Sequence, residues 1–112
     1  MKDDAPLAFV VEHHDKPEIE IQVNFGVFAG RAATAAEIDD LARWLLDVVA
    51  DVTIISEERH EFDRTVEVSL HLVRIELARA PGDRFARREL AERLRERAEH
   101  WARACIADRH YL

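Results

Sequence analysis

Residues 18–28 read EIEIQVNFGVF, with apolar side chains at every second position. A period of two places one set of side chains on a buried face and the other on a wet face, which is typical of a half-buried strand. The stretch therefore predicts a long strand from Glu18 to about Phe28, with Gly26 at a bulge or at a close approach of the backbone. A sheet with one dry face needs a covering layer, so the fold class depends on the helices around this strand.

Further strands are predicted on both sides of this stretch. A short apolar run begins at Leu7, and a turn around Pro17 returns the chain alongside it. Later in the chain, residues 53–56 start another strand, whose polar continuation over 57–61 is expected to be an exposed end that projects beyond the core, and residues 66–77 also read as a strand. Within 66–77 the alternation changes phase between Leu72 and Val73. Either a bulge restores one face, or the strand is buried on both sides, which implies another layer such as a second copy of the protein.

Two helices are predicted, one after each pair of strands. Residues 34–37 read TAAE, the pattern of a capping box, in which the threonine and glutamate side chains satisfy free backbone N–H groups at a helix start. An apolar stripe at helical spacing then continues to Val52. The second helix follows Asp83, a capping residue, and its apolar stripe consists of Leu90, Ala91, Leu94, Ala98, Trp101 and Cys105.

The predicted order is β-β-α-β-β-α. We expect an α+β fold, in which a four-stranded antiparallel sheet carries both helices on one face. The 112 residues suit a single domain over 1–112, with a frayed tail at 1–6.

Composition disfavours several classes of function. The chain has 16 basic and 23 acidic side chains, for a net charge of −7, and acids interleave with the arginines of the second helix. Both features argue against a nucleic-acid surface. No apolar run approaches the roughly 20 residues that cross a bilayer, so no membrane partner is expected. The acidic start MKDD and the single Cys105 favour a cytoplasmic protein.

No catalytic or cofactor motif is present in the sequence. The three glycines are isolated, so a phosphate-binding loop is not supported, and neither serine lies in a nucleophile elbow. Two serines, three threonines, one asparagine and one glutamine leave few groups for recognising a polar ligand. Cys105 lies on the apolar stripe of the second helix, which predicts a buried thiol. We therefore assign no catalytic residue and expect no cofactor.

One histidine constellation remains open. If Asp63 and Arg64 form a two-residue turn, Glu58 faces Ser69 and His60 faces Glu67, and one sheet face collects Glu58, His60, Glu67, Ser69 and His71. Histidine beside carboxylates suits acid–base chemistry or a divalent metal. An ordinary polar sheet face is the alternative, and a slip of one residue would destroy the set. The adjacent His13 and His14 would point to opposite faces of a strand and would not chelate together.

Protein association is the function that the sequence favours. The interface candidates are aromatic side chains together with two apolar residues that follow the change of phase in the strand over 66–77. They are Phe28, Trp44, Val73, Ile75 and Trp101. We expect a small non-catalytic protein that acts through protein–protein contacts, as a homodimeric accessory or regulatory protein. The alternative is a small-ligand-binding or metal-binding domain, or an enzyme, that uses the face with His60 and His71.

Overall fold

The protein, in a computed structural model, is described over residues 6–11, 18–49, 51–62 and 67–109, with the backbone alone at 61, 67–69, 108 and 109. Its elements are β1 (Ala8–Val11), β2 (Ile19–Val23), α1 (Phe25–Ala29), α2 (Ala35–Leu46), β3 (Thr53–Phe62), β4 (Glu67–Leu77) and α3 (Arg84–Arg109). The predicted α+β order is confirmed, with α1 as an additional short helix. The predicted tail, apart from Pro6, and the two adjacent histidines lie outside the described residues.

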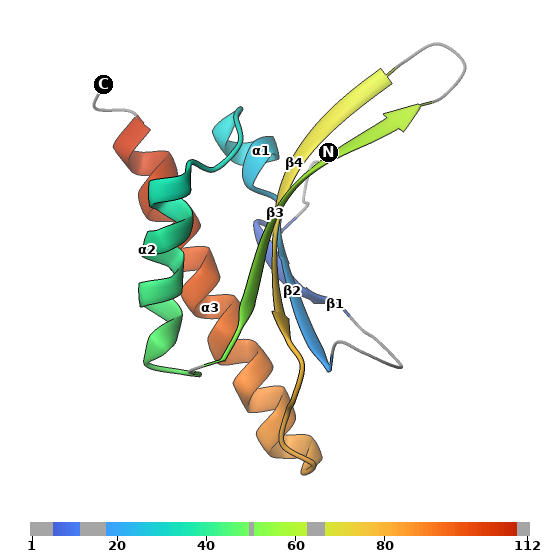
Figure 1. Ribbon diagram of the computed structural model, residues 1–112, viewed down its shortest axis with the longest axis vertical. Coiled ribbons are helices and arrows are strands. Elements are labelled where there is room, and N and C mark those ends of the chain that lie inside the picture. Colours follow the sequence, from blue (N-terminus) through green and yellow to red (C-terminus); the bar gives the residue numbers. More distant parts are fainter. Residues whose placement is uncertain (1–5, 12–17, 50, 63–66, 110–112) are drawn as a thin grey trace.

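The four strands form one antiparallel sheet in the order β1-β2-β4-β3. The register aligns one row of side chains across all four strands, because Ile21 pairs with both Val10 and Ile75, and Ile75 also pairs with Ile54. This row belongs to the hydrophobic core or packs against it. The helices lie together on that one face of the sheet (Figure 1), as the apolar patterns predict.

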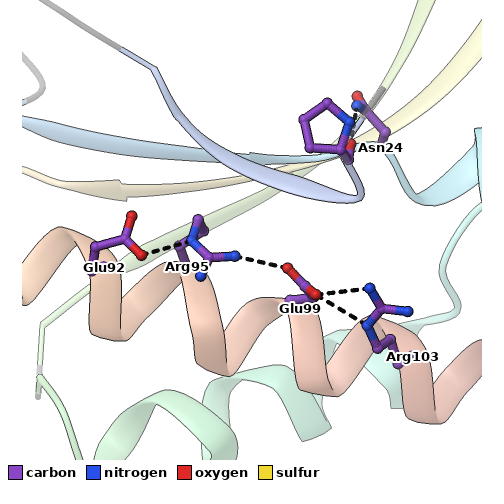
Figure 2. A network of polar contacts seen from close by, with 6 residues as sticks. Asn24, Glu92, Arg95, Glu99 and Arg103 are labelled. Atoms are coloured by element: carbon purple, nitrogen blue, oxygen red, sulfur yellow. Dashed lines mark hydrogen bonds and ion pairs between the residues drawn. The ribbon is translucent and has the colours of Figure 1, made fainter. Parts of the chain in front are cut away.

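The predicted long strand is wrong beyond Val23, where the chain turns into α1. Asn24 follows the end of β2, and its side-chain amide donates to the carbonyl of Pro6 over 2.9 Å (Figure 2). Its side-chain carbonyl accepts from the side-chain amide of Gln22 over 3.0 Å. Phe25 then turns its ring into the core, where it lies 5.3 Å from the ring of Trp101. A period-two pattern of five apolar residues thus covers a strand and the start of a helix.

Two glycines shape α1. Gly26 lies against β4, where an added Cβ would come within 2.8 Å of the Cβ of His71 and 3.0 Å of its backbone nitrogen. Of the two roles predicted for Gly26, the close approach of the backbone is therefore the one that the structure shows. Gly30 ends the helix in the left-handed conformation, with φ of 76°, and its N–H donates to the carbonyl of Gly26 over 2.9 Å.

The capping box at the start of α2 is confirmed in both of its bonds. The N–H of Glu37 donates to the Thr34 hydroxyl over 3.1 Å, and the N–H of Thr34 donates to the Glu37 carboxylate over 2.9 Å. Leu41 and Leu45 are fully buried on the core side. The helix ends at Leu46, which is earlier than the apolar stripe predicts.

The long α3 packs across β1, β2, α1 and α2. Most of its predicted stripe is buried, with Leu90 at the margin; the buried members are Ala91, Leu94, Ala98, Trp101 and Cys105. Charged side chains separate the members of this stripe along the whole helix. No described helix has the length and apolar character of a membrane span.

The phase change in β4 is resolved without a bulge. Every residue from Glu67 to Glu76 pairs with a residue of β3 in one continuous register, so Leu72 and Val73 point to opposite faces. Both are buried, as the second of the two predicted alternatives requires at this point, but Arg74 and Glu76 on the face of Leu72 are partly exposed, so the structure does not show the further layer which that alternative implies. Val73 belongs to the main core, whereas Leu72 lies outside it.

The sheet face opposite the helices carries an ion-pair cluster around Arg74. Its guanidinium lies 3.0 Å from the carboxylate of Glu57, 3.1 Å from Glu76 and 3.8 Å from Glu20. The contact between Nε of Arg74 and Oε1 of Glu57 lacks hydrogen-bond geometry, so it acts as an ion pair. Glu20 is only 5% exposed, and Arg74 supplies positive charge beside it.

A candidate interaction surface on the projecting hairpin and α1

The outer part of the β3–β4 hairpin extends beyond the rest of the sheet (Figure 1). β2 pairs with β4 only from Val73 to Leu77, whereas β3 continues to pair with β4 as far as Glu67. Residues 57–62 and 67–72 are therefore a two-stranded ribbon, which we call the arm. Helix α1 lies at the base of the arm, where Gly26 contacts His71.

The predicted register of this hairpin is shifted by two residues. Glu58 pairs with His71 rather than Ser69, and His60 pairs with Ser69 rather than Glu67. The predicted two-residue turn lies outside the described residues. Because side chains alternate with a period of two, a shift of two leaves every predicted residue on the same face of the ribbon as before.

On the histidine face, the imidazole of His60 lies near the carboxylate of Glu58, a contact that is ionic only when the imidazole is protonated. Nε2 of His60 lies 3.8 Å from Oε2 of Glu58, and its ring stacks on that of Phe62 with centroids 6.3 Å apart. His71 lies opposite Glu58 and is thus a diagonal neighbour of His60. The side chains of Glu67 and Ser69 lie outside the description. Among the described side chains, no group of three or more metal-ligating residues is gathered in a way that could hold a metal ion.

Three of the five predicted interface residues are wrong. Val73, Ile75 and Trp101 are buried in the core of the chain itself, so none presents a surface to a partner. Trp44 is half-buried against the core and meets the ring of His100 edge-on at 6.3 Å. Phe28 is the one candidate with a large exposed area, since 43% of its surface is accessible.

Four large exposed hydrophobic residues that the structure describes were not predicted, and two of them lie on α1 and the arm. Val27 on α1 is 58% exposed and Phe62 at the end of β3 is 71% exposed. In the strand pattern, Val27 is one of the apolar residues predicted on the buried face. Because the chain becomes helical at Phe25, the side chain of Val27 points outward instead. Among the described residues, the large exposed hydrophobic side chains are Val27, Phe28, Leu46, Phe62 and Phe85. Three of these five belong to α1 and the arm.

A network of polar contacts fixes the chain that follows α1. Arg31 donates to both carboxylate oxygens of Glu37 over 2.8 Å, and its guanidinium lies 5.4 Å from the centre of the Phe25 ring. The hydrogen bonds from Arg31 hold the pKa of the Glu37 carboxyl at about 2. The α1 surface is thus attached to α2 by a bidentate ion pair, which favours a rigid platform.

Cys105 is a buried free thiol at the same junction. Burial, together with the Glu37 carboxylate, raises the pKa of the Cys105 thiol to about 12. Thiolate is the reactive form of cysteine, and this environment keeps the thiol protonated at neutral pH. The position packs as an apolar residue, as the sequence predicts.

The fold and the surface define a small α+β protein with a projecting two-stranded arm. Comparisons with protein-family models, curated proteins and solved structures found no match to the chain. The assignment of a function therefore depends on the surface of the chain itself.

Proposed function

We propose that the protein acts through protein–protein association rather than catalysis, as a homodimer in which the arm of each copy lies over α1 of the other. One observation carries this proposal: three of the five large exposed hydrophobic side chains in the described part of the chain lie on the tip of the arm, at Phe62, and on α1, at Val27 and Phe28. Exposed aromatic clusters are typical of protein interfaces.

The dimensions of the arm support this arrangement. From the Glu58–His71 pair to the Phe62–Glu67 pair, the strand advances by four residues, or about 13 Å at roughly 3.3 Å per residue. A helix with its side chains is about 10 Å across. The arm is therefore long enough to lie over one helix of a partner and to bring Phe62 against its apolar side chains.

The symmetry of a dimer suits these two surfaces. A two-fold contact uses the same patches on both copies, so an apolar tip and an apolar platform on one chain generate two identical contacts. A two-stranded ribbon is marginally stable by itself in water. Cover from a second copy would stabilise the arm, which the rest of its own sheet does not flank. We place this dimer in the cytoplasm, as the single cysteine favours.

The test is the subunit stoichiometry of two matched variants. We expect native mass spectrometry and light scattering to give a dimer for the wild type at micromolar concentration, and a monomer for Phe62→Asp and for Phe28→Asp. Phe85→Asp is the matched control, because Phe85 is as exposed as Phe62 but lies at the start of α3. This control should remain a dimer.

Circular dichroism would check that each variant is folded, which is expected because the substituted side chains are exposed. A wild-type protein that is monomeric at 100 µM would contradict the proposal. So would dissociation of the Phe85→Asp control to the same extent as Phe62→Asp.

A further inference from the structure

A groove of about 520 Å³ lies at the other edge of the sheet, between β1 and the first half of α3. Its apolar lining consists of Val10, Val11, Ile19 and Ala91, and its charged lining consists of Glu18, Arg84, Arg87, Arg88 and Glu92. The apolar residues come from the two strands and from the core side of the helix. The arginines come from the first two turns of α3.

The charges of this groove are unevenly balanced. Arg87 donates to the Glu18 carboxylate over 2.8 Å and to the Pro81 carbonyl over 3.3 Å. Glu92 accepts from Arg95 over 3.0 Å. Within the described part of the chain, Arg84 and Arg88 have no ion pair and no side-chain hydrogen bond. Among the described residues, these two guanidinium groups therefore carry positive charge at the groove without an ion-pair partner, on a protein whose net charge is −7.

The same side of α3 is neutralised farther along the helix. Figure 2 shows a continuous row of ion pairs in which Arg95 bridges Glu92 and Glu99, and Glu99 also accepts from Arg103. Arg103 and Arg95 hold the pKa of the Glu99 carboxyl below its ordinary value. On the row that continues from Arg84 and Arg88, the arginines beyond the groove are thus paired with carboxylates.

Strand β1 supplies a second recognition element. It lies at the edge of the sheet and pairs with β2 alone. In an antiparallel pair, alternate residues direct their N–H and C=O groups away from the partner strand. The outer edge of β1 therefore presents backbone donors and acceptors in a row, which is the template for adding another strand.

We propose that this groove binds an extended acidic peptide segment of a partner protein, which adds to β1 as a fifth strand. Strand addition obtains its affinity from main-chain hydrogen bonds and its specificity from alternate side chains. Of the side chains that the segment directs towards α3, the apolar ones would lie on Val10 and Ala91 and the carboxylates would bind Arg84 and Arg88. The complementary charge identifies the segment as acidic. This surface lies across the sheet from the arm, so the inference goes beyond the homodimer and does not depend on it.

The experiment measures the fluorescence anisotropy of a labelled peptide, about eight residues long, in which the alternate residues that would face α3 are two valines followed by two aspartates and the other residues are threonines. We expect saturable binding that weakens as salt is added. Arg84→Glu/Arg88→Glu should weaken it by at least about tenfold, since each lost charge-assisted bond is worth about a factor of ten. The helix should tolerate these acids, because negative charge is favourable in the first turn, where Arg84 lies, and because Arg88 is exposed. Circular dichroism would verify this.

The matched control is Arg79→Glu/Arg93→Glu, which makes the same change in net charge at exposed arginines outside the groove. Its affinity should stay within about twofold of the wild type. A peptide with N-methyl groups on alternate residues tests strand addition, and it should bind at least about tenfold more weakly in one of its two phases.

Three results would overturn the proposal. The first is the absence of binding, and the second is an equal loss of affinity in the control variant, which would indicate non-specific attraction. The third is full displacement of the peptide by millimolar sodium acetate together with unchanged binding of both N-methylated peptides, which would assign the groove to small anions.

Discussion

The indole N–H of Trp101 donates to the backbone carbonyl of Glu37 over 2.8 Å, and the two residues are 64 positions apart in the chain. Glu37 lies in the first turn of α2 and Trp101 in the last third of α3. The side chain of Glu37 meanwhile binds Arg31 and the backbone of Thr34. One residue therefore joins the loop after α1, the start of α2 and the buried face of α3.

The bond to Trp101 gives the first prediction. Trp101→Phe should lower the free energy of unfolding by about 1–3 kcal/mol, because it removes a buried hydrogen bond and leaves part of the indole volume empty. Urea denaturation would measure the change. Trp44→Phe, at a half-buried ring, should cost less than about 1 kcal/mol. Equal losses in the two variants would contradict the role of the hydrogen bond.

The ion pair of Glu37 gives a prediction on pH. The pKa of this carboxyl falls from 4.5 to about 2 on folding, so the charged form stabilises the folded state above pH 4.5 and this contribution disappears as pH falls towards 2. Glu37→Gln retains a capping residue but loses the charge. At pH 7 it should be less stable by about 1–2 kcal/mol, after allowance for the partial exposure of Arg31.

The difference in free energy of unfolding between wild type and Glu37→Gln should shrink between pH 4.5 and pH 2. Urea titrations at several pH values would follow it, with the exposed Glu96→Gln as a control that shows no such difference. A difference that persists unchanged at pH 2 would exclude the ion pair as its source.

The third prediction concerns Gly26. Gly26→Ala should destabilise the protein by about 1–3 kcal/mol, because the added Cβ would lie 2.8–3.0 Å from atoms of His71, most of them backbone atoms that cannot move aside. Gly82→Ala is the control, since its Cβ would meet nothing within 4 Å. It should be neutral or slightly stabilising. Thermal unfolding would rank the two, and a neutral Gly26→Ala would mean that α1 does not press on β4.

The fourth prediction concerns the ion-pair cluster on the open sheet face. Arg74→Met should lower the free energy of unfolding by about 1–3 kcal/mol, because the nearly buried Glu20 would lose a positive neighbour. Arg43→Met breaks an exposed pair with Asp40 and should cost under about 0.5 kcal/mol. The double variant Arg74→Met/Glu57→Gln should recover part of the loss, because one of the repelling carboxylates is gone. Additivity of the two substitutions would contradict this coupling.

Local signals in the sequence predicted the elements well where one residue pattern has one structural meaning. The capping box at Thr34 and Glu37 is an example, since its two hydrogen bonds exist only at a helix start. The strand pattern through Phe28 is less specific. Apolar residues at Phe25, Val27 and beyond satisfy a strand, but the amide contact of Asn24 with Pro6, which follows the end of β2, depends on residues far apart in sequence.

The candidate surface was predicted less well, for a related reason. Periodicity indicates that a residue is covered and not which chain covers it, so Val73 and Ile75 read equally well as core or as interface. The register of the hairpin depended on a loop length that residues near Asp63 do not specify, and it shifted by two. Exposure of Phe62 follows from how far the arm projects, which only the pairing of β4 with its two neighbours reveals.

Strand β4 divides into two segments with different neighbours, and this division sets two rates of hydrogen exchange. Amides from Val73 to Glu76 lie between β2 and β3, so they exchange with deuterium only when the whole sheet opens. Amides in the outer segment need only the separation of two strands. If the arm is covered by a second copy, diluting the protein should accelerate exchange in the outer segment while leaving the inner one unchanged.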